Sequence, residues 1–178
     1  EVIVPRRKGL QPHQRLNGVD IRAFEPSRFD EAVRLLRDSS STIFHSQQPS
    51  VMTFLAQRLR PDAKHIVTCR DPRTFADWQI EFRDATWKRR LLIPFNYVTE
   101  DGPLVSFAVR GADAVGCPAH FLRDKVQSLY GLAEKPGYMP NLIEVPAAVP
   151  DKPRTPTLAF VGRLDVRKRP HLFLDLVA

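Results

Sequence analysis

Long apolar runs and cysteines are both scarce in this sequence. No apolar run approaches the roughly 20 residues that a membrane-spanning helix needs, and the N-terminal charges follow a very short apolar run, which is the reverse of a secretory signal. The two cysteines, Cys69 and Cys117, are too few for a disulfide framework, and no Asn-x-Ser/Thr glycosylation signal occurs. We therefore expect a cytoplasmic protein with reduced, buried thiols.

Sequence motifs of several common ligand sites are absent too. There is no Gly-x-x-x-x-Gly-Lys and no Gly-x-Gly-x-x-Gly stretch, which argues against a nucleoside triphosphatase or a standard dinucleotide site. The five histidines lie far apart and form no His-x-x-x-His pair, so no metal site is predicted. His45 stands beside Ser46 without a Gly-x-Ser-x-Gly turn. We expect His45 either at a strand end near a cleft or as a hydrogen-bonded structural histidine.

Acidic residues are outnumbered by basic ones. The 27 Lys and Arg residues against 20 Asp and Glu residues give a formal net charge of +7. Such an excess favours nucleic acid, phosphorylated ligands or an anionic membrane surface as partner, although a solvated basic surface has the same composition. Because no zinc-finger, homeodomain or RNP-type motif accompanies the charge, we do not expect nucleic acid as the partner.

Short apolar runs rich in β-branched residues alternate with longer segments of helical periodicity. This alternation predicts an α/β fold with a Rossmann-like parallel sheet and flanking helices. The expected strands are 2–4, 21–24, 42–45, 65–69 and 114–117; the expected helices start at a Ser27–Asp30 capping box and cover 51–59, 75–90, 104–110 and 121–130. Ligands bind such sheets at the carboxyl ends of the strands, so the residues after each strand are the candidates for function.

The composition changes after Tyr130. Six prolines lie between Pro136 and Pro156, a density that neither a helix nor a central strand tolerates. We interpret 149–156 as a semi-rigid linker between one domain, 1–148, and the start of another, 157–178.

The closing stretch places two cations after an apolar run and a glycine. The run 157–161 is expected to be a strand; Gly162, Arg163 and Lys168 follow, and a helix is expected to begin near Pro170. The glycine lets a ligand approach the backbone, arginine can donate two hydrogen bonds to one phosphate, lysine adds a point charge, and the helix N-terminus favours an anion. The alternative is a basic turn whose charges are solvated.

This stretch resembles the start of the second domain of the GT-B glycosyltransferases of family 4 (group 1). The family has an apolar strand, Gly-Arg and, a few residues later, Lys-Gly; Arg169 stands here in place of that glycine. Four upstream stretches resemble the family in the same order: 42–47, 66–71, 112–122 and 138–144. They depart from it at Gln47 and Arg70, where histidine is common, at Cys117-Pro118, where serine is usual, and at Leu142, where glycine is common.

The resemblance implies a role for each matching residue. Gly162, Arg163 and Lys168 would bind the diphosphate of the donor, and Arg163 and Lys168 would be catalytic because they stabilise the charge of the leaving group. The residues implied on the cleft or acceptor side are His45, Gln47, Arg70, Asp71 and Asn141. Arginine cannot act as a base at neutral pH, so Arg70 would only donate hydrogen bonds. Trp78 and Trp87 border an acceptor site or, in keeping with their residue type, pack in the core or in an interface.

The function implied is transfer of a sugar from a nucleoside-diphosphate sugar to an acceptor, which is a saccharide, a lipid-linked molecule or a small molecule. The family usually retains anomeric configuration and needs no metal or other cofactor. The net charge is compatible with peripheral docking on the inner face of an anionic membrane. The family's N-terminal glycine-rich loop and its C-terminal pair of glutamates have no counterpart, so we expect a fragment of a GT-B fold that is inactive alone. The alternatives are a GT-B epimerase or phosphorylase, or a non-catalytic basic binding module.

Overall fold

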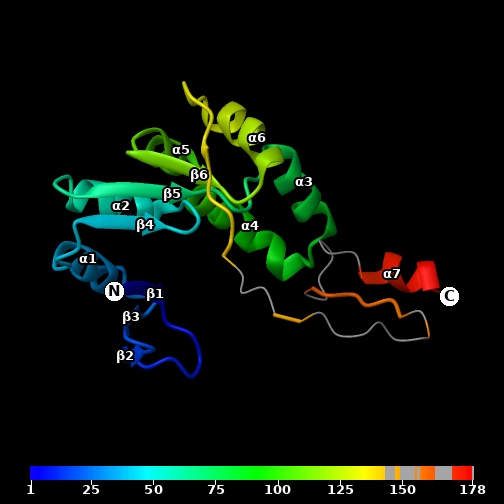
Figure 1. Ribbon diagram of the computed structural model, residues 1–178, viewed down its shortest axis with the longest axis horizontal. Helices are drawn as coiled ribbons and strands as arrows, with labels where there is room; N and C mark the ends of the chain where they lie inside the picture. Colours follow the sequence, from blue (N-terminus) through cyan, green and yellow to red (C-terminus); the bar gives the residue numbers. More distant parts are fainter. Residues whose placement is uncertain (143–146, 149–154, 156, 163–169, 178) are drawn as a thin grey trace.

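A computed structural model describes residues 1–142, 147–148, 155, 157–162 and 170–177 of the chain. Over these residues the fold is α/β, with two sheets and helices packed on them and on one another (Figure 1). The sequence predicted a single sheet, and that prediction is wrong because strands 2–4 and 21–24 pair with each other and not with the remaining strands.

The smaller sheet has three strands in the order β1-β3-β2. Strand β1 (Val2–Pro5) is parallel to β3 (Val19–Phe24), whereas β2 (His13–Leu16), which the sequence analysis missed, is antiparallel to β3. A two-residue turn joins β2 to β3: Asn17 has φ 49° and Gly18 has φ 81°. Positive φ at both positions is the geometry that favours Asn-Gly in tight hairpins, so the sequence did contain a signal for this hairpin.

The larger sheet is entirely parallel, as the strand–helix alternation predicted. Its order is β4-β5-β6-β7. Strands β4 (Ile43–Ser46), β5 (Lys64–Thr68) and β6 (Ala114–Cys117) confirm the three central predictions, while β7 (Gly137–Tyr138) was not predicted. The carboxyl ends of these strands therefore lie at one edge of the sheet, where ligands bind in folds of this kind.

Seven helices occur among the described residues: α1 (Phe29–Arg37), α2 (Val51–Leu59), α3 (Phe75–Asp84), α4 (Trp87–Glu100), α5 (Pro103–Arg110), α6 (His120–Tyr130) and α7 (Pro170–Val177). Helix α2 begins at a capping box in which Ser50 and Thr53 bond reciprocally, and α6 ends at Gly131 in the left-handed conformation. The expected 75–90 helix is in fact two helices, since the chain is extended at Ala85 and Thr86. This pair and α5 together form the connection between β5 and β6.

The main core lies between the larger sheet and its helices. Its fully buried members are Val67, Cys69, Val105, Val109, Cys117, Val126 and Tyr130. Both cysteines are free and buried, as expected from the sequence. Burial raises the pKa of the Cys69 thiol to about 12 and also raises the pKa of Cys117, so both thiols stay protonated at neutral pH.

The C-terminal prediction is confirmed only in part. Helix α7 begins at Pro170, as expected, but residues 157–161 form no strand. A strand needs a neighbouring strand to accept its backbone hydrogen bonds, and none of the described residues pairs with 157–161. Figure 1 places α7 apart from both sheets. Most of the expected linker, 149–156, lies outside the described residues.

Candidate functional site

A pocket of about 510 Å³ opens at the carboxyl edge of the larger sheet. Its lining residues are His45, Gln47, Thr68, Arg70, Met139, Pro140, Asn141 and Leu142. They come from the end of β4, the end of β5 and the segment after β7. Since these strands are parallel, the sheet itself brings together residues that are up to about a hundred positions apart.

A line of hydrogen bonds links four of the residues that line the pocket. The Gln47 side-chain nitrogen lies 3.1 Å from Nδ1 of His45, and Nε2 of His45 lies 2.7 Å from the Thr68 hydroxyl. The Thr68 hydroxyl donates in turn to the sulfur of Met139 at 3.8 Å. These contacts join β4, β5 and the segment after β7.

Both ring nitrogens of His45 have side-chain partners. A side-chain amide nitrogen can only donate, so Nδ1 of His45 accepts from Gln47, and Nε2 faces the Thr68 hydroxyl. In this arrangement His45 is a positioning residue, because neither nitrogen is open to take a proton from a ligand.

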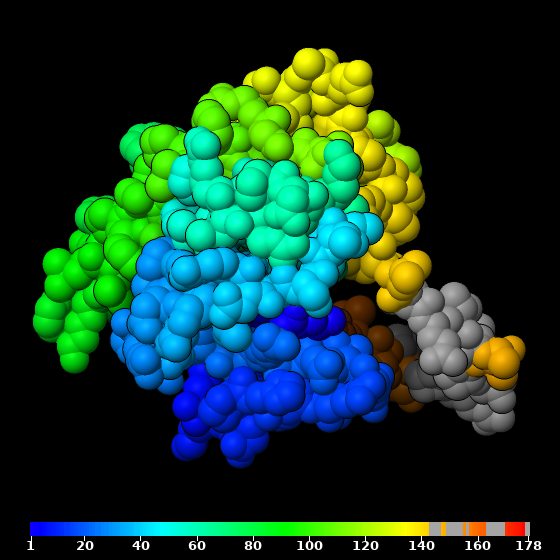
Figure 2. Space-filling model, turned by 90° about the vertical axis from the view of Figure 1, so that its left-hand side faces the viewer, coloured from blue at the N-terminus to red at the C-terminus, as the bar shows by residue number. Residues whose placement is uncertain are grey.

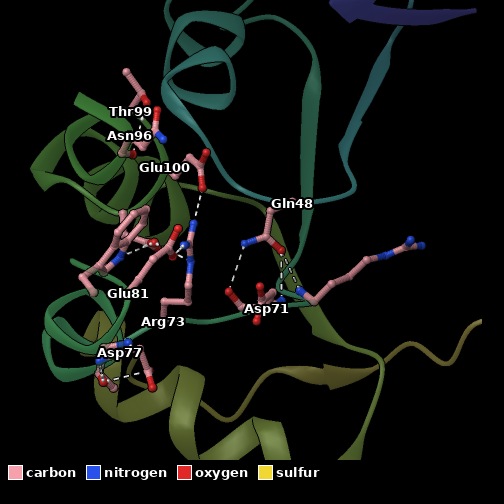
Figure 3. Close-up of polar contacts among 12 residues, drawn as sticks. Gln48, Asp71, Arg73, Asp77, Glu81, Asn96, Thr99 and Glu100 are labelled. Atoms are coloured by element: carbon pink, nitrogen blue, oxygen red, sulfur yellow. Dashed lines mark hydrogen bonds and ion pairs between the residues drawn. The ribbon is translucent and has the colours of Figure 1, made fainter. Parts of the chain in front are cut away.

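The backbone next to Arg70 is held by a side chain from the neighbouring strand end. Gln48 Oε1 accepts from the backbone nitrogens of Arg70 at 2.9 Å and of Asp71 at 3.1 Å, and its side-chain nitrogen donates to the Asp71 carbonyl at 3.5 Å (Figure 3). The backbone of Asp71 is thus held by Gln48, but Asp71 does not line the pocket. Gln48 thus connects the segments that follow β4 and β5 through hydrogen bonds. The sequence analysis did not identify it as a site residue.

Arg70 makes the pocket electropositive. Among the described residues it is the one lining side chain that carries a permanent charge, and its guanidinium forms no ion pair with any of them. Gln47 and Asn141 add amide groups that both donate and accept hydrogen bonds. An anionic, hydroxyl-rich ligand matches this set of groups, since a guanidinium can donate two parallel bonds to a phosphate or carboxylate.

Gly116 of β6 lies behind the pocket wall. A Cβ added at Gly116 would come within 2.7 Å of Cγ of Met139, closer than two such atoms can approach. The absence of a side chain at Gly116 therefore leaves room for the Met139 side chain, which lines the pocket. The sequence analysis did not identify Thr68, Met139 or Gly116 as site residues. Thr68 is the last residue of β5, and Met139 directly follows β7.

The structure brings together four of the five residues expected on the acceptor side. His45, Gln47, Arg70 and Asn141 line the pocket, and Asp71 lies beside it. Of the residues expected to bind the donor, Gly162 is exposed and does not line the pocket, while Arg163 and Lys168 lie outside the described residues.

A second polar cluster follows the pocket loop and has a structural role. Arg73 bonds Glu81 at 2.9 Å, contacts Glu100 and approaches Asp101 at 3.6 Å (Figure 3). Its guanidinium also lies 3.6 Å from the ring centre of Trp78. The cluster joins α3 to α4 and fixes the loop that carries Arg70.

Burial raises the pKa of Asp101 in this cluster. The opposing influences, a hydrogen bond from Trp78 Nε1 at 2.9 Å and the charge of Arg73, do not offset the loss of hydration. Trp78 is buried and has a packing role, one of the two roles considered for it, whereas Trp87 is exposed and lines neither the core nor the pocket.

No group of three or more His, Cys, Asp and Glu side chains within the described ranges is placed to hold a metal ion. In the same part of the chain, every helix is too short or too polar to cross a bilayer. Comparison with models of known protein families gave no match, and neither curated proteins nor solved structures gave one.

Proposed function

We propose that the chain is part of a glycosyltransferase that moves a sugar from a nucleoside-diphosphate sugar to an acceptor, and that the pocket receives the acceptor. The observation that supports this proposal best is the gathering of His45, Gln47, Arg70 and Asn141 around one pocket. The resemblance of the sequence implies the acceptor side for these residues, and they come from three separate stretches of the chain.

The size and chemistry of the pocket suit a sugar-like acceptor. Its volume of about 510 Å³ falls within the usual range for small-molecule sites. Amide groups at Gln47 and Asn141 can both donate to and accept from hydroxyl groups, and Arg70 can bind an acidic group on the acceptor. His45, held by Gln47 and Thr68, keeps this surface in position.

The donor half of the proposal concerns Gly162, Arg163 and Lys168. These residues would hold the diphosphate of the donor, with the two cations stabilising the negative charge of the leaving nucleoside diphosphate. The acceptor hydroxyl would attack the anomeric carbon, the bond from that carbon to the diphosphate oxygen would break, and the leaving diphosphate oxygen would take the hydroxyl proton. Since both ring nitrogens of His45 are occupied, we do not assign it the removal of that proton.

The acceptor pocket is tested by ligand binding to the chain itself. Glucose 6-phosphate and uncharged glucose are titrated into isotopically labelled protein, and the amide NMR signals are followed. We expect the phosphorylated sugar to bind more tightly and to shift the signals of Thr68, Arg70 and Asn141. Arg70→Met is expected to weaken its binding by roughly 10- to 100-fold, as for the loss of a charge-assisted hydrogen-bonding partner.

The matched control is Arg83→Met, since Arg83 is also an exposed arginine but lies outside the pocket. It should leave the affinity unchanged. Equal binding of the two sugars, or no loss of affinity in Arg70→Met, would contradict the proposed pocket. Tight binding of the chain to RNA or DNA with a steep salt dependence would favour a nucleic-acid-binding module instead.

A further inference from the structure

Helix α4 has two apolar faces, and one of them is uncovered. Ile93 is buried against the rest of the molecule with 4% of its surface exposed. On the other side, at helical spacing, Trp87, Leu91, Phe95 and Val98 are exposed by 69, 72, 67 and 51%. Large apolar side chains in such a row are rare on a monomer surface unless something binds there.

Cations surround the start of this face. Lys88, Arg89 and Arg90 directly follow Trp87, and the first turn of α4 contains no acidic residue. This is the reverse of what the helix dipole favours, because the N-terminal end of a helix is already positive. The arrangement therefore costs some helix stability unless negative charge lies nearby.

The protein supplies that negative charge only in part. Arg89 pairs with Glu81 at 2.7 Å, and Arg90 donates to the carbonyls of Phe82 and Arg83 at the end of α3. Lys88 has no carboxylate partner within the described part of the chain, and its ammonium lies 5.6 Å from the ring centre of Trp87. The indole and the ammonium thus share one end of the exposed face.

The α3–α4 region also stands out from the body of the protein. Figure 2 shows the green part of the chain projecting to one side of the molecule. Helix α3 begins five residues after Arg70, so this region leaves the sheet at the edge where the pocket opens. A projecting face is accessible to a broad, flat partner.

We propose that the α4 face formed by Trp87, Leu91, Phe95 and Val98 docks on the surface of an anionic lipid bilayer. Leucine and phenylalanine side chains enter the acyl boundary, the indole of Trp87 lies at headgroup level, and Lys88 meets the anionic headgroups. A parallel pairing with a second copy of the chain would bring two cationic helix starts together. An antiparallel pairing would not, so self-association is the competing outcome of the test. Docking does not depend on the proposed sugar transfer.

Flotation with vesicles tests this docking. The chain is mixed with vesicles of phosphatidylcholine alone or with phosphatidylglycerol added, at low and high salt. We expect binding to the anionic vesicles that salt weakens, and a blue shift of tryptophan fluorescence that Trp87→Phe abolishes. The double variant Leu91→Gln with Phe95→Gln should reduce partitioning by about tenfold or more, since it removes most of the inserted apolar area.

Two controls keep the result interpretable. Phe121→Gln and Leu16→Gln remove exposed apolar side chains on other elements and should leave binding unchanged. Lys88→Gln should weaken binding to anionic vesicles only. The proposal is overturned if anionic vesicles do not bind, or if neutral vesicles bind equally well. It is also overturned if the Leu91/Phe95 double variant abolishes self-association of the chain while vesicles have no effect.

Discussion

Arg70 and Arg73 are three residues apart, but their guanidinium groups have opposite environments. Arg70 is exposed in the pocket without an ion pair among the described residues, whereas Arg73 is surrounded by Glu81, Glu100 and Asp101 and is 12% exposed. A buried arginine with several carboxylate partners maintains structure, and an unpaired one at a pocket mouth is available for a ligand. The sequence alone does not distinguish the roles of these two arginines, because the difference lies in the contacts that each makes in the folded protein.

We expect Arg73→Met to destabilise the protein by about 3–5 kcal/mol at pH 7, because Asp101 would stay buried without a cation and Glu81 would keep only its ion pair with Arg89. Burial already raises the pKa of Asp101, so its contribution to stability falls as pH rises through its folded pKa. Without Arg73 this pKa rises further. The stability lost in the variant relative to the wild type should therefore be larger at pH 7 than at pH 4, as measured by urea unfolding.

The exposed Arg83→Met serves as the reference for this experiment and should change stability by less than about 0.5 kcal/mol. A loss in Arg73→Met no larger than that of the reference at every pH would show that the cluster contributes nothing to stability.

At the scale of elements, caps decide where helices begin and end. The sequence predicted a capping box at Ser27 and Asp30, and this prediction is wrong: α1 starts after Arg28 without a side-chain cap. The Asp30 carboxylate instead forms ion pairs with the guanidinium groups of Arg28 and Arg34, so it does not cap the helix. A capping box that the sequence analysis did not single out starts α3, where Thr74 and Asp77 bond reciprocally.

The end of α6 allows a direct test of a cap. Gly131 has φ 62°, and no atom lies within 4 Å of the position that a Cβ would occupy. Gly131→Ala should therefore cost about 1 kcal/mol through backbone strain alone. Gly131→Asn should cost less, because asparagine tolerates the left-handed region better. Thermal unfolding of the two variants measures this difference in stability. An equal loss of stability in both variants would mean that the positive φ of residue 131 does not determine the destabilisation.

At the scale of the whole molecule, the two sheets differ in how deeply they are buried. Every member of the main core cluster lies in the larger sheet, in its helices or, in the case of Cys69, directly after β5. In the smaller sheet, all residues of β1 and β2 are exposed or half-buried. We therefore expect the larger sheet, on which the pocket lies, to be the more stable of the two.

Hydrogen exchange followed by mass spectrometry should reflect this difference. Backbone amides of β5 and β6 are expected to exchange at least roughly tenfold more slowly than those of β2 and β3, because local opening needs less free energy where fewer apolar groups are buried. Equal protection of the two sheets would indicate that they unfold as one cooperative unit.

The local pattern of the sequence was sufficient to predict strands β4, β5 and β6, helices α2, α5 and α6, and the burial of both thiols. β-Branched runs and helical periodicity act over a few residues, so the chain carries that information without its fold. The tertiary structure alone decided that β1 and β3 leave the larger sheet, that 157–161 finds no partner strand among the described residues, and that His45, Thr68 and Met139 join in one line of hydrogen bonds. Strand pairing and pocket formation depend on contacts between residues far apart in the chain, and no local pattern specifies these.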